Sequence, residues 1–219
     1  MGLDMYLNKI KKFGNCTISD VRAVDNVFDL EQWNKDHPDE KCTLERWCGL
    51  KEPPAKEIMD FYIPLMKEQG TYYKWKSAIE QVAYWRKANQ IFKWFEDNCA
   101  DGHFENCSSV LVTKEQLEKL LRTCKMVLAN SELVDGKVKN GKRMAVGLEG
   151  WEDIIEDGQV VEDKSIAQEL LPTRSGFFFG STEYDQYYIE DIQSTINQIM
   201  PIISDTDFDE YDIYFCADW

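Results

Sequence analysis

Three residues with the right chemistry for zinc, Cys99, His103 and Cys107, follow the pattern C-x3-H-x3-C. A structural zinc site needs four ligands. The spacing identifies none of the upstream candidates for a fourth ligand, which are Cys16, Cys42 and Cys48. We therefore interpret the segment as a loop that contains unrelated thiols, and we expect neither a metal nor another cofactor.

Two further segments resemble ion-binding loops only in part. The acidic run that begins at Asp205 starts like a calcium loop, but Glu210 and Cys216 stand where that loop requires glycine and glutamate. The segment Gly136–Arg143 (GKVKNGKR) resembles a phosphate-binding loop, but Arg143 replaces the serine or threonine that binds magnesium. We exclude both kinds of site.

Catalytic motifs are also missing from the sequence, which contains no G-x-S-x-G, H-E-x-x-H or G-x-G-x-x-G. The chain has two histidines, His37 and His103, so acid–base catalysis would depend on carboxylates, lysines or tyrosines. The candidate bases for a hydrolase or transferase acting on a phosphate-bearing substrate are Asp4, Glu183 and Asp185. The sequence favours a protein that is not an enzyme.

The segment Leu171–Tyr188 (LPTRSGFFFGSTEYDQYY) has the greatest density of residues that suit ligand binding. Ser181 or Thr182 is expected to cap the last helix and to leave amides free for an anion. Arg174 suits a carboxylate or phosphate, and tyrosines offer stacking faces. The alternative interpretation is a buried strand followed by a tight helix cap, because runs of aromatic residues more often form core than pocket.

We expect the helix around Trp85–Lys93 to lie beside the loop Ser175–Asp185 and to leave an opening. In this hypothesis Arg86 and Arg174 contact anionic groups, the aromatic side chains stack on a base, and Asn89 donates or accepts a hydrogen bond. The predicted ligand-binding residues are Trp85, Arg86, Asn89, Arg174, Ser181, Tyr184 and Tyr188.

The charge of the chain restricts its partners. A formal net charge of -15 repels phosphate backbones and anionic lipids, so we expect no direct nucleic-acid or membrane partner. The same charge attracts a basic protein, although its alternative role is solubility alone. No apolar run is long enough to span a bilayer, no signal peptide is evident, and the seven cysteines form no C-x-x-C. We therefore expect a cytoplasmic protein with reduced thiols.

The elements that position these residues predict an α+β fold. Leu3–Leu7 and Tyr211–Cys216 are predicted strands that share a mixed or antiparallel sheet, packed against about four to six helices. The predicted helices are a turn or two in Asp29–Asn34, then Ala55–Gln69 kinked at Pro64, Ser77–Asn98, Thr113–Leu128, Ser165–Leu171, and Tyr187–Met200 with Pro201 just beyond it.

Turn signals dominate residues 130–163. Asp135-Gly136, Asn140-Gly141, Gly147, Gly150 and Asp157-Gly158 favour hairpin turns between short strands near Val138, Met144–Leu148 and Gln159–Val161. Phe177–Phe179 is expected to be a short buried strand. We interpret residues 1–219 as one α+β domain with a hairpin-rich insertion at 130–163.

Four segments resemble, in order, a family of uncharacterised phage, prophage and bacterial proteins: MGLDMYL at the start, YWRKANQIFKWF from Tyr84, TKEQLEKLLRTCKMVL from Thr113, and LLPTRSGFFFGSTEYDQYYIEDI from Leu170. Together they cover about a quarter of the chain. The family has no established activity to carry over, and the resemblance implies a mobile-element origin.

Three functional hypotheses follow. The first is a phage-type accessory binding protein that counters host defence, either by occupying a basic host protein or by sequestering a nucleotide-like ligand. The second is the phosphate-substrate hydrolase or transferase that uses carboxylates. The third is a structural or accessory protein without a pocket. The oligomeric state is not predicted.

Overall fold

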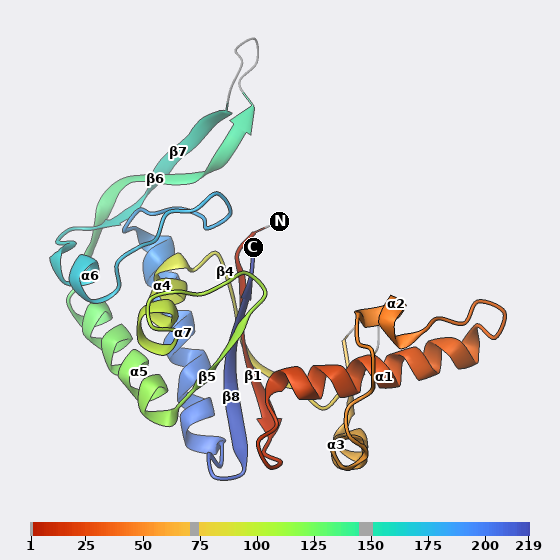
Figure 1. The fold of residues 1–219 in the computed structure, drawn as a ribbon. Helices are drawn as coiled ribbons and strands as arrows, with labels where there is room; N and C mark the ends of the chain where they lie inside the picture. Colours follow the sequence, from red (N-terminus) through yellow and green to blue (C-terminus); the bar gives the residue numbers. More distant parts are fainter. Residues whose placement is uncertain (1, 71–74, 145–150) are drawn as a thin grey trace. The chain divides into compact units, whose positions relative to one another are not determined.

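The structure, a computed structural model, describes residues 2–70, 75–144 and 151–219. A four-stranded antiparallel sheet has the order β4 (Glu80–Arg86), β1 (Asp4–Lys11), β8 (Tyr211–Asp218) and β5 (Ser109–Val112). The predicted α+β class is confirmed, and so is the shared sheet, because the two terminal strands are neighbours in it (Figure 1).

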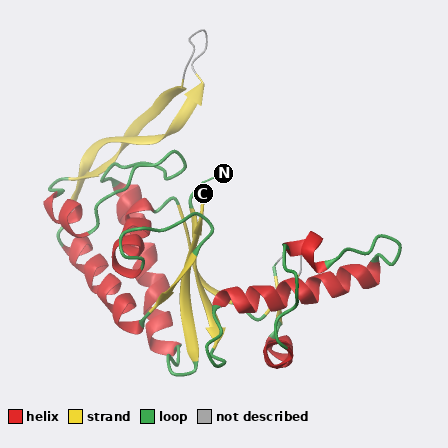
Figure 2. Cartoon of the chain, viewed as in Figure 1, coloured by secondary structure: helices red, strands yellow, loops and turns green. Residues whose placement is uncertain are grey.

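Contacts along the chain group its residues into two compact units. The first comprises Met1–Leu7, Ala83–Thr206 and Phe215–Trp219, and the second comprises Asn8–Val82 and Asp207–Tyr214. Figure 2 colours the helices and strands of the chain. The units are described in turn.

In the first unit, helices α4 (Asn89–Cys99), α5 (Lys114–Ala129) and α7 (Gln186–Asp205) cover one face of the sheet (Figure 1). Their core is aromatic: the rings of Phe95 and Phe215 stack with centroids 4.1 Å apart, and Phe92 packs edge-on against neighbouring rings. The predicted helix at 113–128 is confirmed together with its capping box, in which Thr113 and Gln116 satisfy each other's backbone amides.

The long helix predicted for Ser77–Asn98 is wrong. Residues 80–86 form strand β4, in which Ala83 and Trp85 are buried while Tyr84 and Arg86 are exposed. This alternation has the two-residue period of a strand. Lys87 then takes a positive φ of 62°, which ends the strand, and α4 begins at Asn89.

The segment that follows α5 forms a long hairpin of β6 (Leu133–Met144) and β7 (Trp151–Val161). Gly136 and Gly158 are paired across it, so Asp135-Gly136 and Asp157-Gly158 lie within strands and not at the predicted turns. A Cβ at Gly158 would lie 2.6 Å from the Val138 side chain, which explains the glycine. Asn140-Gly141 lies at a register shift, whereas Gly147, Gly150 and residues 145–148 lie outside the described residues.

Two predictions about the last third of the chain need correction. Phe177–Phe179 is a turn, in which the Phe179 amide donates to the Gly176 carbonyl, and not a buried strand. Helix α7 is capped by Asp185 and not by Ser181 or Thr182, and it continues through Pro201. The short helix α6 (Ser165–Leu170) is confirmed.

The second unit contains α1 (Ile18–Asp36), α2 (Leu44–Cys48), α3 (Lys56–Tyr62), the 3₁₀ turn η1 (Ile63–Leu65), and the paired strands β2 (Lys67–Gln69) and β3 (Trp75–Ser77). Helix α1 extends far beyond the predicted turn at 29–34. The predicted helix at 55–69 is shorter than expected: α3 ends at Tyr62, the chain continues through Pro64 as η1, and residues 67–69 form β2. Among the described helices, none combines the length and the hydropathy that crossing a bilayer requires.

Candidate functional site

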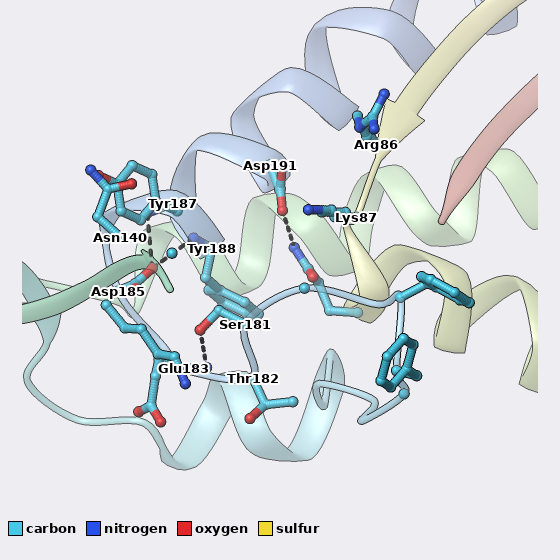
Figure 3. A pocket seen from close by; sticks show the side chains of 17 residues that line it. Arg86, Lys87, Asn140, Ser181, Thr182, Glu183, Asp185, Tyr187, Tyr188 and Asp191 are labelled. Atoms are coloured by element: carbon cyan, nitrogen blue, oxygen red, sulfur yellow. Dashed lines mark hydrogen bonds between the residues drawn. The ribbon is translucent and has the colours of Figure 1, made fainter. Parts of the chain in front are cut away.

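A cleft of about 900 Å³ lies in the first unit (Figure 3). Its walls come from the end of β4 with the start of α4, the loop 176–183, the start of α7, and residues 139–141 of β6. A volume of this size accommodates a small organic ligand. We refer to this space as the cleft.

Asn89 holds the loop against α4. This side chain is 1% exposed, and its amide nitrogen donates to the carbonyl oxygens of Phe179 at 3.0 Å and Ser181 at 2.7 Å. Its amide oxygen accepts from the Arg174 backbone N–H at 2.8 Å. The predicted neighbourhood of the 85–93 segment and the glycine-phenylalanine loop is therefore present, and Asn89 has a positioning role.

A close backbone approach also shapes the loop. Gly180 has a φ of +90°, and a Cβ built there would lie 3.0 Å from the Lys87 Cβ and 3.2 Å from the Lys87 carbonyl oxygen. Only glycine tolerates both the positive φ and this contact without strain. The loop therefore sits directly on the β4–α4 turn, which presents Lys87 to the cleft.

Cationic side chains gather where β4 ends. Arg86 and Lys87 both line the cleft and are exposed. Arg86 forms an ion pair with Asp4 at 3.8 Å between Nη1 and Oδ1, while its side chain remains 56% exposed. No carboxylate of the described residues forms an ion pair with Lys87. Because the Arg86–Asp4 pair is exposed, it is weak, and Arg86 remains available to an anionic ligand. Lys87 is available as well.

Carboxylates gather along the start of α7. Asp191 accepts from the Gln90 side-chain amide at 3.1 Å, and burial raises the pKa of Asp191 to about 6 despite that hydrogen bond. Asp185 is 1% exposed, and burial also raises the pKa of its carboxyl. Its Oδ1 caps α7 by accepting from the Tyr187 and Tyr188 amides at 3.0 and 3.2 Å.

Aromatic side chains complete the lining. Tyr187 and Tyr188 come from α7, and their hydroxyls donate to the Glu156 side chain at 3.1 Å and to the Leu171 carbonyl at 2.9 Å. Phe177 and Phe178 lie on the loop with ring centroids 4.8 Å apart, and Phe177 is 95% exposed. An aromatic ring left in water at a cleft is suited to stacking on a flat ligand.

The predicted ligand-binding residues divide into two groups. Arg86, Ser181 and Tyr188 line the cleft. The remaining four are not among the lining residues: Trp85, Asn89, Arg174 and Tyr184.

These four residues have partners inside the fold. The Trp85 indole donates to the Thr195 hydroxyl at 2.9 Å, and the Tyr184 hydroxyl accepts from the Thr173 amide at 3.2 Å. Arg174 forms a 2.7 Å ion pair with Glu96, whose side chain is only 6% exposed. The guanidinium also lies over the rings of Phe92 and Phe179. Arg174 therefore neutralises a buried acid.

Sequence reasoning missed Lys87, Gln90, Tyr187 and Asp191 among the cleft residues. For Asp191 a signal existed, because it follows Tyr188 by three positions on a helix and therefore shares its side. Lys87 carried no such signal, since its exposure depends on the turn at its positive φ. Among the described residues, no group of three His, Cys, Asp or Glu side chains is arranged to hold a metal ion.

Comparison of the chain with protein-family models, with curated proteins and with solved structures finds no match.

Proposed function

We propose that this protein binds a nucleotide-like small molecule in the cleft and sequesters it. The observation that carries the proposal is the composition of one cleft of about 900 Å³, which combines two exposed cations with aromatic side chains and polar groups. Phosphate suits Arg86 and Lys87, and a flat base suits the exposed ring of Phe177. In Figure 3, Arg86 and Lys87 lie at one end of the cleft while Asn140 and Glu183 lie at the other.

The resemblance to phage and prophage proteins supports an accessory role, in which the protein withholds the ligand from a host process. The net charge of -15 supports the other form of the hypothesis, a basic host protein as partner. The cleft favours the small molecule, because basic partners need no concave site lined by arginine and lysine.

The test is isothermal titration calorimetry with AMP and GMP, each compared with its nucleoside. We expect the wild-type protein to bind at least one mononucleotide more tightly than the matching nucleoside. Arg86→Gln is expected to weaken mononucleotide binding about tenfold, since a charge-assisted hydrogen bond contributes about 1.5–3 kcal/mol.

Arg122→Gln is the matched control. Arg122 lies on α5, pairs with Glu118 at the same 3.8 Å distance, and is not among the cleft residues. This substitution is expected to leave binding unchanged. The absence of binding by either mononucleotide at millimolar concentration, or an equal loss in both arginine variants, would contradict the proposal.

A second candidate function has one specific observation in its favour. Asp191 lines the cleft with a pKa of about 6, and a carboxyl with such a pKa suits general acid–base catalysis near neutral pH. A phosphate-substrate hydrolase or transferase would therefore use Asp191, beside the predicted Glu183 and Asp185. Hydrolysis of a bound nucleotide, followed by phosphate release and lost in Asp191→Asn, would favour this function over sequestration.

A further inference from the structure

Two carboxylates that line the cleft, Asp185 and Asp191, each have an oxygen that receives no hydrogen bond from the described residues. Oδ1 of Asp185 receives two backbone amides, but Oδ2 is buried and has no hydrogen-bond partner among the described residues. On Asp191, Oδ2 accepts from Gln90, and no donor from the described residues reaches Oδ1. A buried acceptor without a partner is destabilising, so a ligand that donates a hydrogen bond to such an oxygen gains affinity.

Among the described residues, no ion pair neutralises Asp185 or Asp191. The groups that act on the Asp191 charge are Glu190 and Asp185, which both raise its pKa, and the neutral Gln90. The groups that act on Asp185 are Glu183, which raises its pKa, and the amides at the start of α7. The cleft therefore presents carboxylate acceptors from the start of α7, while its cations Arg86 and Lys87 come from the end of β4.

We propose that Asp185 and Asp191 select the base of the ligand, and that they favour a guanine-type ring because its edge carries adjacent N–H donors. This inference rests on the proposed function, since it assumes a nucleotide in the cleft with its phosphate at Arg86 and Lys87. Guanine offers N1–H and a 2-amino group on one edge. Adenine and cytosine have a ring nitrogen that accepts hydrogen bonds beside their amino group. That nitrogen would repel a carboxylate oxygen, because both atoms are acceptors.

The test compares GMP, IMP and AMP by calorimetry at pH 7.5. GMP is expected to bind about tenfold more tightly than IMP, which lacks the 2-amino donor, and at least tenfold more tightly than AMP. Asp191→Asn should remove most of the preference for GMP over AMP, because an amide donates as well as accepts.

Glu190→Gln is the matched control, since Glu190 is exposed, adjacent in sequence and not among the cleft residues. It should keep the preference for GMP. Equal binding of AMP and GMP, or an unchanged preference in Asp191→Asn, would overturn the inference and leave nucleotide binding intact. Failure of all three nucleotides to bind would instead overturn the proposed function on which the inference rests.

Discussion

Replacement of Asn89 by alanine is the sharpest test of how the fold builds the cleft. The substitution removes three hydrogen bonds at a side chain that is 1% exposed. It leaves two carbonyl oxygens, on Phe179 and Ser181, and one backbone amide, on Arg174, without their partner. Each removed hydrogen bond contributes about 1 kcal/mol net, and buried orphaned groups add to the loss. We expect Asn89→Ala to lower the free energy of unfolding by about 3–4 kcal/mol.

Unfolding in urea, followed by tryptophan fluorescence and extrapolated linearly to water, measures this loss. Asn197→Ala is the matched control, because Asn197 lies on a helix, is exposed, and among the described side chains forms a hydrogen bond only with Gln193, one turn away. A surface substitution of this kind changes stability by about 0.5 kcal/mol or less. The same chemical change thus separates the buried contacts from the effect of alanine in a helix.

Hydrogen exchange gives a second measurement at one atom. The Arg174 amide donates to Asn89, so its exchange should become faster in Asn89→Ala and remain slow in Asn197→Ala. The reasoning is refuted if the two variants differ by less than about 1 kcal/mol in unfolding free energy and if the Arg174 amide keeps its protection.

Three further perturbations have defined outcomes. Gly180→Ala should lower the thermal midpoint by several degrees, since a loss of about 1–3 kcal/mol is expected when alanine takes a positive φ against the Lys87 backbone; an unchanged midpoint would contradict the close approach. Arg174→Ala should cost about 3 kcal/mol in urea unfolding, because it leaves Glu96 buried and unpaired, whereas the double replacement with Glu96→Gln should recover much of that loss. Burial raises the pKa of the Asp25 carboxyl to about 6, above its value of about 3.8 in the unfolded chain. The folded state therefore binds the carboxyl proton more tightly than the unfolded state does. The free energy of unfolding should accordingly rise as the pH falls from about 7 to about 4. Asp25→Asn should flatten this rise by about 2–3 kcal/mol in urea titrations at each pH, and an identical pH profile would contradict the buried carboxyl.

The elements that could be predicted from the sequence carry local signals. Helix α5 has a capping box and a stripe of apolar residues, and β8 is rich in strand formers at the end of the chain. Helix α1 had a usable signal as well, because its buried residues recur every three positions: Ile18, Val21, Val24, Val27 and Leu30. Its many charged residues concealed this stripe.

The error at 77–98 has a physical cause. Apolar residues from β4 and α4 follow one another without a proline or glycine between them, so a helical period fits both elements when they are taken as one. The break depends on Lys87, a non-glycine residue at positive φ, which sequence patterns do not reveal. The turn then separates Trp85, buried in the sheet, from Asn89, buried under the loop.

The candidate site was only partly predictable for a related reason. Arg86 and Arg174 are both arginines, but their surroundings differ. Arg86 is an exposed residue at the end of β4, whereas Arg174 forms an ion pair with the buried Glu96. Sequence shows no partner for either, and the partner decides whether a guanidinium is available to a ligand. The unpaired oxygen of Asp185 likewise depends on its place as the cap of α7.

Native mass spectrometry of the protein purified from cells tests the central claim most directly, because it weighs the chain together with whatever the cleft retains. Wild-type protein and Arg122→Gln are expected to carry the same small-molecule adduct with the mass of a nucleotide, and Arg86→Gln is expected to lose it. Recovery of the bare chain in every case, or of the same adduct in all three proteins, would contradict sequestration of a nucleotide in the cleft.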